Sequence, residues 1–395
     1  VFDPKERAKA IGIWAGAVGM GIAIGPIVGG ALLGHFWWGS VFLINVPIVI
    51  IGAILIRVLV PESRNPNPGR HDPLGVVLEV VGLVLVIYAI IKAGDLGSLR
   101  PVQVWAPFVV GAVALAVFVW YERRSDHPTL DMALFRDPRF SAAVGSVGLV
   151  FFALMGTTFF MVFYLQIARG YSPLQAGVRF LPLAFAQIIA SPRSPKLVRR
   201  YGAKAVCTSG LLLMTATFVG YVTLGQHTSI WVLEGLFFLQ GLAMGNIMPP
   251  ATESIMSSVP REKAGAGSAI NNVARQVGAA LGIAVLGSVL ASSYRKGIDP
   301  TLTKLPITAA VRGQMEKSVE ATQAVVEKVG ASLQSVIPAS NTAFIHAMHV
   351  TSLFSAIFGL AGTFVAFKFL PGRRPADVGA PATDAPVQES VMVAE

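Results

Sequence analysis

Long apolar runs alternate with short polar segments along most of the chain. A transmembrane helix needs about 20 consecutive apolar residues, because the hydrocarbon core of a bilayer is about 30 Å thick. Ten runs are close to that length or longer, and we predict each of them to be a membrane span. The predicted spans are 8–33, 38–60, 74–93, 104–122, 140–167, 174–192, 205–225, 230–249, 264–291 and 346–370.

Composition agrees with a membrane protein. Of the 395 residues, 54% are hydrophobic and only 13% are charged, whereas a soluble domain carries about 25% charged residues. The mean hydropathy is +0.65. We therefore predict an all-α polytopic membrane protein with about ten transmembrane helices. The single cysteine, Cys207, excludes an internal disulfide framework.

The net charge of +10 comes from basic residues that gather in alternate short loops. If the N-terminus is cytoplasmic, 20 lysines and arginines lie inside and three lie in the short outer loops. This positive-inside bias explains the basic charge without a nucleic-acid partner, and it predicts a multi-pass protein of the inner (plasma) membrane with both ends of this chain in the cytoplasm. The inner groups are Lys5, Arg7, Lys9; Arg57, Arg64, Arg70; Arg123, Arg124, Arg136, Arg139; Arg193, Lys196, Arg199, Arg200, Lys204; Arg261, Lys263; Lys368, Arg373 and Arg374.

Two segments fall outside the predicted spans. The long outer segment 292–345 carries apolar residues at near-helical spacing between 309 and 334, which predicts short amphipathic helices over the outer face. The tail 371–395 is rich in Pro, Ala and Asp, and we expect it to be disordered in the cytoplasm.

The start of the first span is repeated at the start of the ninth. The segment 3–8 reads DPKERA and 259–264 reads VPREKA, and Gly21 and Gly25 then align with Gly278 and Gly282. Internal repeats are typical of secondary transporters. Four spans precede the ninth within its half, but none precedes the first. We therefore expect that this chain lacks the front of its first half and that the complete arrangement has fourteen spans.

Four ordered motifs resemble a known family. The first span carries small residues spaced G-x8-G-x3-G-P-x2-G-G, and this pattern matches the antiporter motif of the major facilitator superfamily at every position. The other motifs are 42–47 (FLINVP), 171–177 (YSPLQAG) and 272–278 (NVARQVG). Together they resemble the fourteen-span drug:proton antiporter branch, the QacA/EmrB type. The motif residues are Gly12, Gly21, Gly25, Pro26, Gly29 and Gly30.

The resemblance implies two six-helix bundles joined through a two-helix insert, working by alternating access. We also expect the protein to be a monomer. In this chain, 1–60 would hold the last two spans of the N-terminal bundle and 61–139 the insert with its cytoplasmic linkers. The segment 140–370 would be the C-terminal bundle. The resemblance also implies proton-coupled efflux of lipophilic, often cationic compounds.

Two elements depart from the family pattern. In the cytoplasmic gating loop, Arg200, Gly202 and Lys204 fit, but Arg199 stands where an aspartate is usual. In the eighth span, Gln240 and Gly241 match an Arg-x-x-Gln-Gly element whose arginine position holds Phe237.

Small residues let helix backbones approach closely in a membrane. We expect the glycine–proline pattern to pack the first span against its counterpart in the other bundle and to let it shift during transport. The alternative is ordinary small-residue packing without a gating role.

Polar groups in apolar spans are the other candidates for a substrate or proton pathway. On the ninth span we expect either an interhelical staple or a lining of the pathway, because a buried charge must face a partner or an aqueous interior. Glu234 is a candidate proton site or counter-charge, with a water-exposed acid as the alternative, and Arg179 is expected to snorkel outward. The ninth-span residues are Asn271, Asn272, Arg275 and Gln276.

Aromatic residues in the fifth span suit flat lipophilic cations. We predict that Phe159 and Gln166 contact substrate, against lipid exposure for the other aromatic residues of that span. No metal site or cofactor is expected, because the six histidines are dispersed and the chain has no phosphate-binding glycine loop. No cluster of catalytic residues points to a membrane enzyme. The alternatives to drug efflux are a transport-inactive membrane fragment and an exporter of a lipid or an endogenous metabolite.

Overall fold

The computed structural model describes residues 4–59, 72–125, 132–259 and 264–370, and the predicted cytoplasmic tail lies outside them. Every regular element in these residues is helical, as the apolar runs predict. The elements are α1 (Pro4–His35), α2 (Ser40–Leu43), α3 (Asn45–Leu59), α4 (Pro73–Leu96), α5 (Val102–Glu122), η1 (Met132–Arg136), α6 (Pro138–Phe163), η2 (Tyr164–Ala168), α7 (Pro173–Arg179), α8 (Leu181–Ala190), α9 (Ser194–Tyr201), α10 (Ala203–Gly220), η3 (Tyr221–Thr223), α11 (Ile230–Ser257), α12 (Ala264–Leu302), α13 (Ala309–Met315), α14 (Val319–Val329), η5 (Ala331–Val336) and α15 (Ile337–Phe369).

Nine helical segments in the described residues are long and apolar enough to cross a bilayer. They correspond to the second through the tenth predicted spans. The first predicted span is α1, a helix of 32 residues; several of its side chains, including that of Pro26, lie outside the described residues. The all-α, polytopic fold class is thus confirmed.

The bounds of several spans differ from the prediction, and α11 continues to Ser257 beyond the predicted end of the eighth span. The sixth span is broken into α7 and α8 at Phe180, because Pro182 has no backbone N–H to continue the hydrogen-bond ladder of α7. The last two spans are longer than expected: α12 continues to Leu302 and α15 begins at Ile337. Much of the predicted outer loop is therefore an extension of these two helices.

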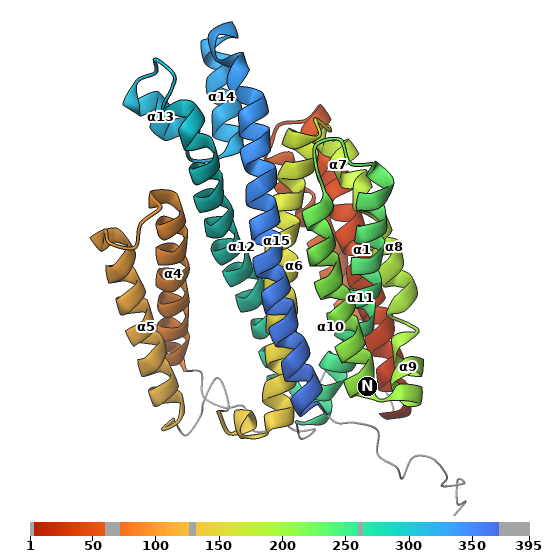
Figure 1. Ribbon diagram of the computed structural model, residues 1–395. Helices are drawn as coiled ribbons and strands as arrows, with labels where there is room; N and C mark the ends of the chain where they lie inside the picture. The colour runs from red at the N-terminus through yellow and green to blue at the C-terminus, as the bar shows by residue number, and fades with distance from the viewer. Residues whose placement is uncertain (1–3, 60–71, 126–131, 260–263, 371–395) are drawn as a thin grey trace, which may run out of the picture.

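Two short helices, α13 and α14, occupy the rest of the outer segment (Figure 1). They do not lie flat over the whole bundle. They stand at the extended ends of α12 and α15, and α14 packs on α15. Polar contacts hold them there, because the Tyr294 hydroxyl lies 2.7 Å from the hydroxyls of both Thr322 and Ser340.

The main bundle is formed by α6, α7, α8, α10, α11, α12 and α15. In it, α12 packs on α6 and α15, α10 packs on α11 and α15, and α11 packs on α8. The hairpin of α4 and α5 lies on one side of this bundle, where α4 contacts α12 (Figure 1). On the opposite side, α1 packs against α7 and α8. Two peripheral elements thus flank one core.

Local sequence signals set the helix starts. Asp72 accepts a hydrogen bond from the Gly75 amide at 2.9 Å and begins α4. Ser172 and Gln175 form a reciprocal capping box at the start of α7. An uncapped helix start leaves unsatisfied backbone N–H groups, and such caps contribute about 1 kcal/mol each. The motif at 171–177 is therefore a helix start.

The two ends of the described chain lie at the same end of the molecule. Figure 1 shows the start of α1, the helix α9 and the last turn of α15 together, with α13 and α14 at the opposite end. The basic cluster of the predicted gating loop, including Arg199 and Arg200, belongs to α9. The side of the membrane that this end faces stays a prediction from the positive-inside rule.

Candidate functional site

The contact between α1 and the main bundle is made by glycines. A Cβ on Gly12 would lie 3.0 Å from the carbonyl oxygen of Ser191, and one on Gly30 would lie 2.7 Å from the backbone nitrogen of Leu174. Gly19, on the same face, approaches the side chain of Gln187. The predicted close approach to the second half is therefore present, but the partners are α7 and α8, whereas the repeat-mate of α1 is α12.

The other motif glycines lie on a different face of α1. No heavy atom of the described residues lies within 4 Å of a Cβ built on Gly21, Gly25 or Gly29. Because a helix turns 100° per residue, Gly21 and Gly25 point roughly away from the face that touches α7 and α8, and Gly29 lies about a quarter turn from that face. The antiporter motif therefore contributes glycines to two surfaces of α1. One surface contacts α7 and α8, and the other, the bare glycine face, contacts no helix in the described residues.

The repeat shows what the bare surface resembles. Gly278 and Gly282 of α12, which align with Gly21 and Gly25, lie directly on the backbone carbonyls of Gly148 and Phe152 in α6. A side chain on either α12 glycine would overlap α6. In the second half, this glycine pair thus holds two helices at backbone contact.

The polar group on α12 is divided between two faces. Asn271 is buried, and Arg275 is half-buried with its guanidinium carbon 4.8 Å from the centre of the Phe151 ring on α6. Asn272 and Gln276 are exposed. Arg275 therefore lies at the α6–α12 contact, and the interhelical staple stays a prediction. A role of the exposed pair in lining a pathway also stays a prediction.

Glu234 is neither free nor simply solvated. Its Oε1 accepts a hydrogen bond from Arg179 Nη1 at 2.6 Å, which joins α11 to α7. The Arg179 guanidinium also lies 5.3 Å from the Tyr171 ring centre. Sequence reasoning treated the two charges separately, although both occur near the outer ends of neighbouring spans and have opposite signs. The opposite charges at the same depth of neighbouring spans were the feature of the sequence that could have predicted this pairing.

The aromatic residues predicted in the fifth span contact different parts of the structure. The rings of Phe159 and Phe163 form a T-shaped pair with centres 4.9 Å apart, and both line a cavity beside α12. Phe152 instead packs on Phe358 of α15, at 4.3 Å. Gln166 lies in the π-helical turn η2 and does not line that cavity. The two residues expected to contact substrate are therefore not brought together.

The predicted gating loop forms α9 and the start of α10. Gly202 has a φ of 86°, a conformation that side chains rarely adopt, and it allows the sharp turn between the two helices. Lys204 lies 4.4 Å above the Phe367 ring of α15, whereas Arg200 stacks on its neighbour Tyr201. Lys204 thus ties the loop to the end of the last helix.

The Arg-x-x-Gln-Gly element of the eighth span, in which Phe237 replaces the arginine, is buried. Phe237 stacks on Phe180 with ring centres 4.8 Å apart, and Gln240 accepts a hydrogen bond from the Tyr221 hydroxyl. Gly241 lies against the Leu183 carbonyl, where a side chain would not fit. Phe237 is therefore a packing residue between α8 and α11. No group of three or more His, Cys, Asp or Glu in the described chain could hold a metal ion.

The glycine contacts, the repeat and the apolar helices together describe a membrane transporter architecture. A family model described as Major Facilitator Superfamily matches residues 1–283. The chain belongs to the Major Facilitator Superfamily.

Relatives within the superfamily include named efflux and resistance proteins. The "Multidrug efflux pump LfrA" of Mycolicibacterium smegmatis is 33% identical over 92% of this chain and 71% of LfrA. The "Multidrug resistance protein Stp" of Mycobacterium tuberculosis is 35% identical over 76% of this chain and 56% of Stp. The "Methyl viologen resistance protein SmvA" of Salmonella typhimurium is 32% identical over 91% of this chain and 72% of SmvA. The chain thus spans between about half and three quarters of these relatives.

A solved structure shares the fold. The crystal structure of a bacterial homologue of the human lysosomal transporter Spinster, inward-facing and unoccupied, superimposes with a TM-score of 0.52 at 16% identity. The match covers 96% of this chain and 74% of that protein. The superfamily and its relatives are transporters, which agrees with the absence of an enzyme signature in the sequence.

Proposed function

We propose that this protein exports lipophilic, often cationic compounds across the plasma membrane in exchange for protons. The names of the relatives support export of drugs, and methyl viologen, which the name of SmvA mentions, is an aromatic dication. In this proposal the end of the molecule with α9 and both chain ends faces the cytoplasm, because the basic clusters lie there.

The contact of α1 with α7 and α8 is the observation that carries the proposal. At Gly12 and Gly30 this contact is made by backbone, with no side chain of α1 inserted between the helices. Such a surface can slide or tilt without repacking interlocked side chains, whereas a densely interdigitated contact resists displacement. Alternating access needs a movable contact of this kind between the two bundles.

The bare glycine face of α1 supports a complete arrangement with more helices than those described. Gly21 and Gly25 contact nothing in the described residues, while their repeat-mates hold α12 on α6. The helix α3 has no buried residue although it is strongly apolar. We propose that helices related to those of the second half cover both surfaces, as in the fourteen-span branch.

The test is a susceptibility assay in cells that produce the protein from its intact gene. Aromatic cations, such as methyl viologen and the more lipophilic ethidium, are compared with neutral and anionic compounds of similar size, with and without a protonophore. We expect protection against the cations that disappears when the proton gradient is collapsed. Equal susceptibility of producing and non-producing cells to every compound would refute export, and protection that survives the protonophore would refute proton coupling.

A further inference from the structure

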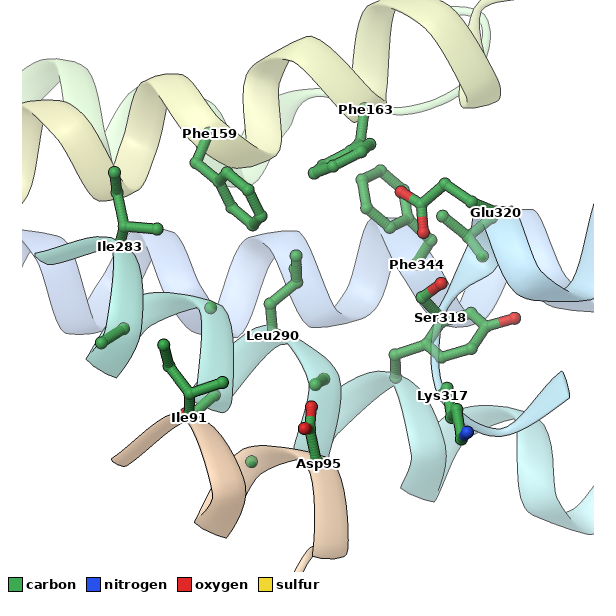
Figure 2. Close-up of a pocket in the computed structure, with 17 residues that line it drawn as sticks. Ile91, Asp95, Phe159, Phe163, Ile283, Leu290, Lys317, Ser318, Glu320 and Phe344 are labelled. Carbon is green, nitrogen blue, oxygen red and sulfur yellow. The ribbon is translucent and has the colours of Figure 1, made fainter. Parts of the chain in front are cut away.

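A cavity of about 270 Å³ lies to the side of the main bundle, at its outer half. Its walls come from the end of α4, from α6, α12 and α15, and from the first turn of α14. Figure 2 shows the side chains of Phe159 and Phe163 entering it from α6, opposite Ile91 and Asp95 of α4. Its lining includes no residue of α1, α7 or α8, so it is separate from the contact between the two halves.

The α4 wall is fixed to α12 at backbone level. Ser288 donates a hydrogen bond from Oγ to the carbonyl of Ile90 at 2.8 Å, and Gly94 lies so close that a Cβ would be 2.7 Å from the Ser288 Cα. Arg295 donates to the carbonyl of Asp95. The insert hairpin is thus held in register with α12 beside the cavity, which keeps this wall in place.

The α14 wall is fixed in the same way. Ser318 accepts a hydrogen bond from the Ala321 amide at 3.2 Å and begins the helix. Thr322 donates to the carbonyl of Met315 at 2.7 Å and also meets the hydroxyl of Tyr294. Both walls are therefore built by specific polar contacts, and the cavity is a formed site of near-ligand size.

The chemistry of the lining is aromatic and acidic. The phenyl rings of Phe159 and Phe163 are joined by that of Phe344, which is buried. Glu320 lines the same cavity as Phe163 and Phe344, and the ammonium of Lys317 points away from the rings (Figure 2). Among the ion pairs of the described residues, none includes Glu320.

A second carboxylate enters from α4. Asp95 points into the cavity (Figure 2), and its ion pair with Lys92 spans 3.8 Å, longer than a hydrogen bond. Aromatic faces and a carboxylate attract the same kind of ligand, a flat apolar group with a positive charge, because the ring face carries negative electrostatic potential.

We infer that this cavity is a binding site, lateral to the contact between the halves, for a small lipophilic aromatic cation. The ligand class rests on the proposed function, whereas the location rests on the cavity alone. In the site the aromatic group stacks among Phe159, Phe163 and Phe344, and the charge lies next to Glu320. The insert hairpin, through α4, thereby gains a role in ligand binding.

The test measures binding of ethidium to the purified full chain in a neutral maltoside detergent by fluorescence anisotropy. Phenanthridine, which has the same ring system without the charge, serves as the matched neutral probe by competition. We expect Glu320→Gln to weaken ethidium binding about fivefold, because the ion pair with the ligand is lost, and to leave phenanthridine unchanged. Phe159→Leu should weaken both probes, because both lose ring contact.

Two control variants have the same chemistry outside the cavity. Glu327→Gln changes an exposed acid of the same helix, and Phe185→Leu changes an exposed phenylalanine of α8; neither should alter binding. Size-exclusion profiles show whether each variant is folded. Unchanged ethidium affinity in folded Glu320→Gln and Phe159→Leu protein would overturn the inference. Displacement of ethidium by phosphatidylethanolamine but not by phosphatidylglycerol, at equal concentrations, would assign the cavity to a lipid and overturn it as well.

Failure of this inference can be told apart from failure of the proposed function. If producing cells export no cation but the purified protein shows Glu320-dependent binding, the export proposal is wrong and the site stands. If cells export ethidium and binding does not respond to either cavity variant, export stands and the site is refuted.

Discussion

Gly30 of α1 lies against the backbone of Leu174 in α7, so closely that a Cβ on the glycine would stand 2.7 Å from the leucine nitrogen. Heavy atoms do not approach a real Cβ to this distance, so any side chain at Gly30 must separate the two helices. In its outer part, the contact between the two halves is therefore made at Gly30. This glycine lies next to the capping box that begins α7.

We therefore predict that Gly30→Leu blocks export. Overpacking of a close contact costs about 1–3 kcal/mol, and α1 would be displaced from α7. Efflux of ethidium from loaded cells should fall at least about tenfold, with less change in the amount of protein in the membrane. Gly34→Leu, one turn farther along α1, is the matched control, because no described atom lies within 4 Å of a Cβ built there. Normal efflux in Gly30→Leu cells would contradict the movable-contact proposal.

The ion pair of Arg179 and Glu234 gives a second prediction. Both side chains are at least two-thirds buried, and removal of one partner leaves a poorly solvated charge. Glu234→Gln should destabilise the protein by about 1–3 kcal/mol, measured as a lower thermal unfolding temperature in detergent. The double variant Arg179→Gln, Glu234→Gln should recover part of that loss.

The same variants separate packing from proton transfer. If Glu234 only pairs with Arg179, the double variant regains export together with stability. If the double variant is stable but the protonophore-sensitive export is absent, Glu234 carries protons in addition to its structural contact.

A third prediction concerns the outer segment. Arg312 of α13 donates from Nε to Glu316 at 2.7 Å and also contacts Asp299 of α12. The hydrogen bonds to Glu316 and Asp299 raise the pKa of Arg312 above its ordinary value. A raised pKa means that this stabilisation is complete below the ordinary value and is lost only as the pH rises through the shifted one.

We therefore expect no pH dependence of this contact between about pH 6 and pH 9. Arg312→Gln should release α13 from α12 and make residues 303–318 cleavable by added protease, at every pH in that range. Lys304→Gln, an exposed neighbour, should leave the protection intact. Equal cleavage of the two variants would show that Arg312 does not hold the segment.

The membrane spans were predictable because the bilayer imposes a length and an apolar composition on each of them. The break at Phe180 between α7 and α8 was not predicted, although Pro182 was visible, because prolines are tolerated within spans when neighbouring helices satisfy the freed backbone groups. Only the surroundings of a proline decide whether its helix ends.

The lateral positions of side chains were harder to predict than the spans. A helix turns 100° per residue, so the sequence shows that Gly12 and Gly30 share a face but not which helix that face meets. The same limit applies to Phe159, whose neighbours in the cavity come from α4 and α14. Those helices are distant in sequence from Phe159. Their contacts depend on the tilt of the long helices and on where those helices end.

Phe237 provides the last prediction, because it occupies the position where the family resemblance implies an arginine. Its ring is buried between Phe180 and Tyr221, and these neighbours cannot neutralise a guanidinium. Phe237→Arg should therefore destabilise the protein by at least about 2.5–3.5 kcal/mol, the cost of a charge at membrane depth. Phe237→Leu, which keeps an apolar side chain, should cost clearly less. Thermal unfolding in detergent measures both changes. If the arginine variant is as stable as the native protein, this position accepts a charge, and the aromatic stack is not what holds α8 against α11.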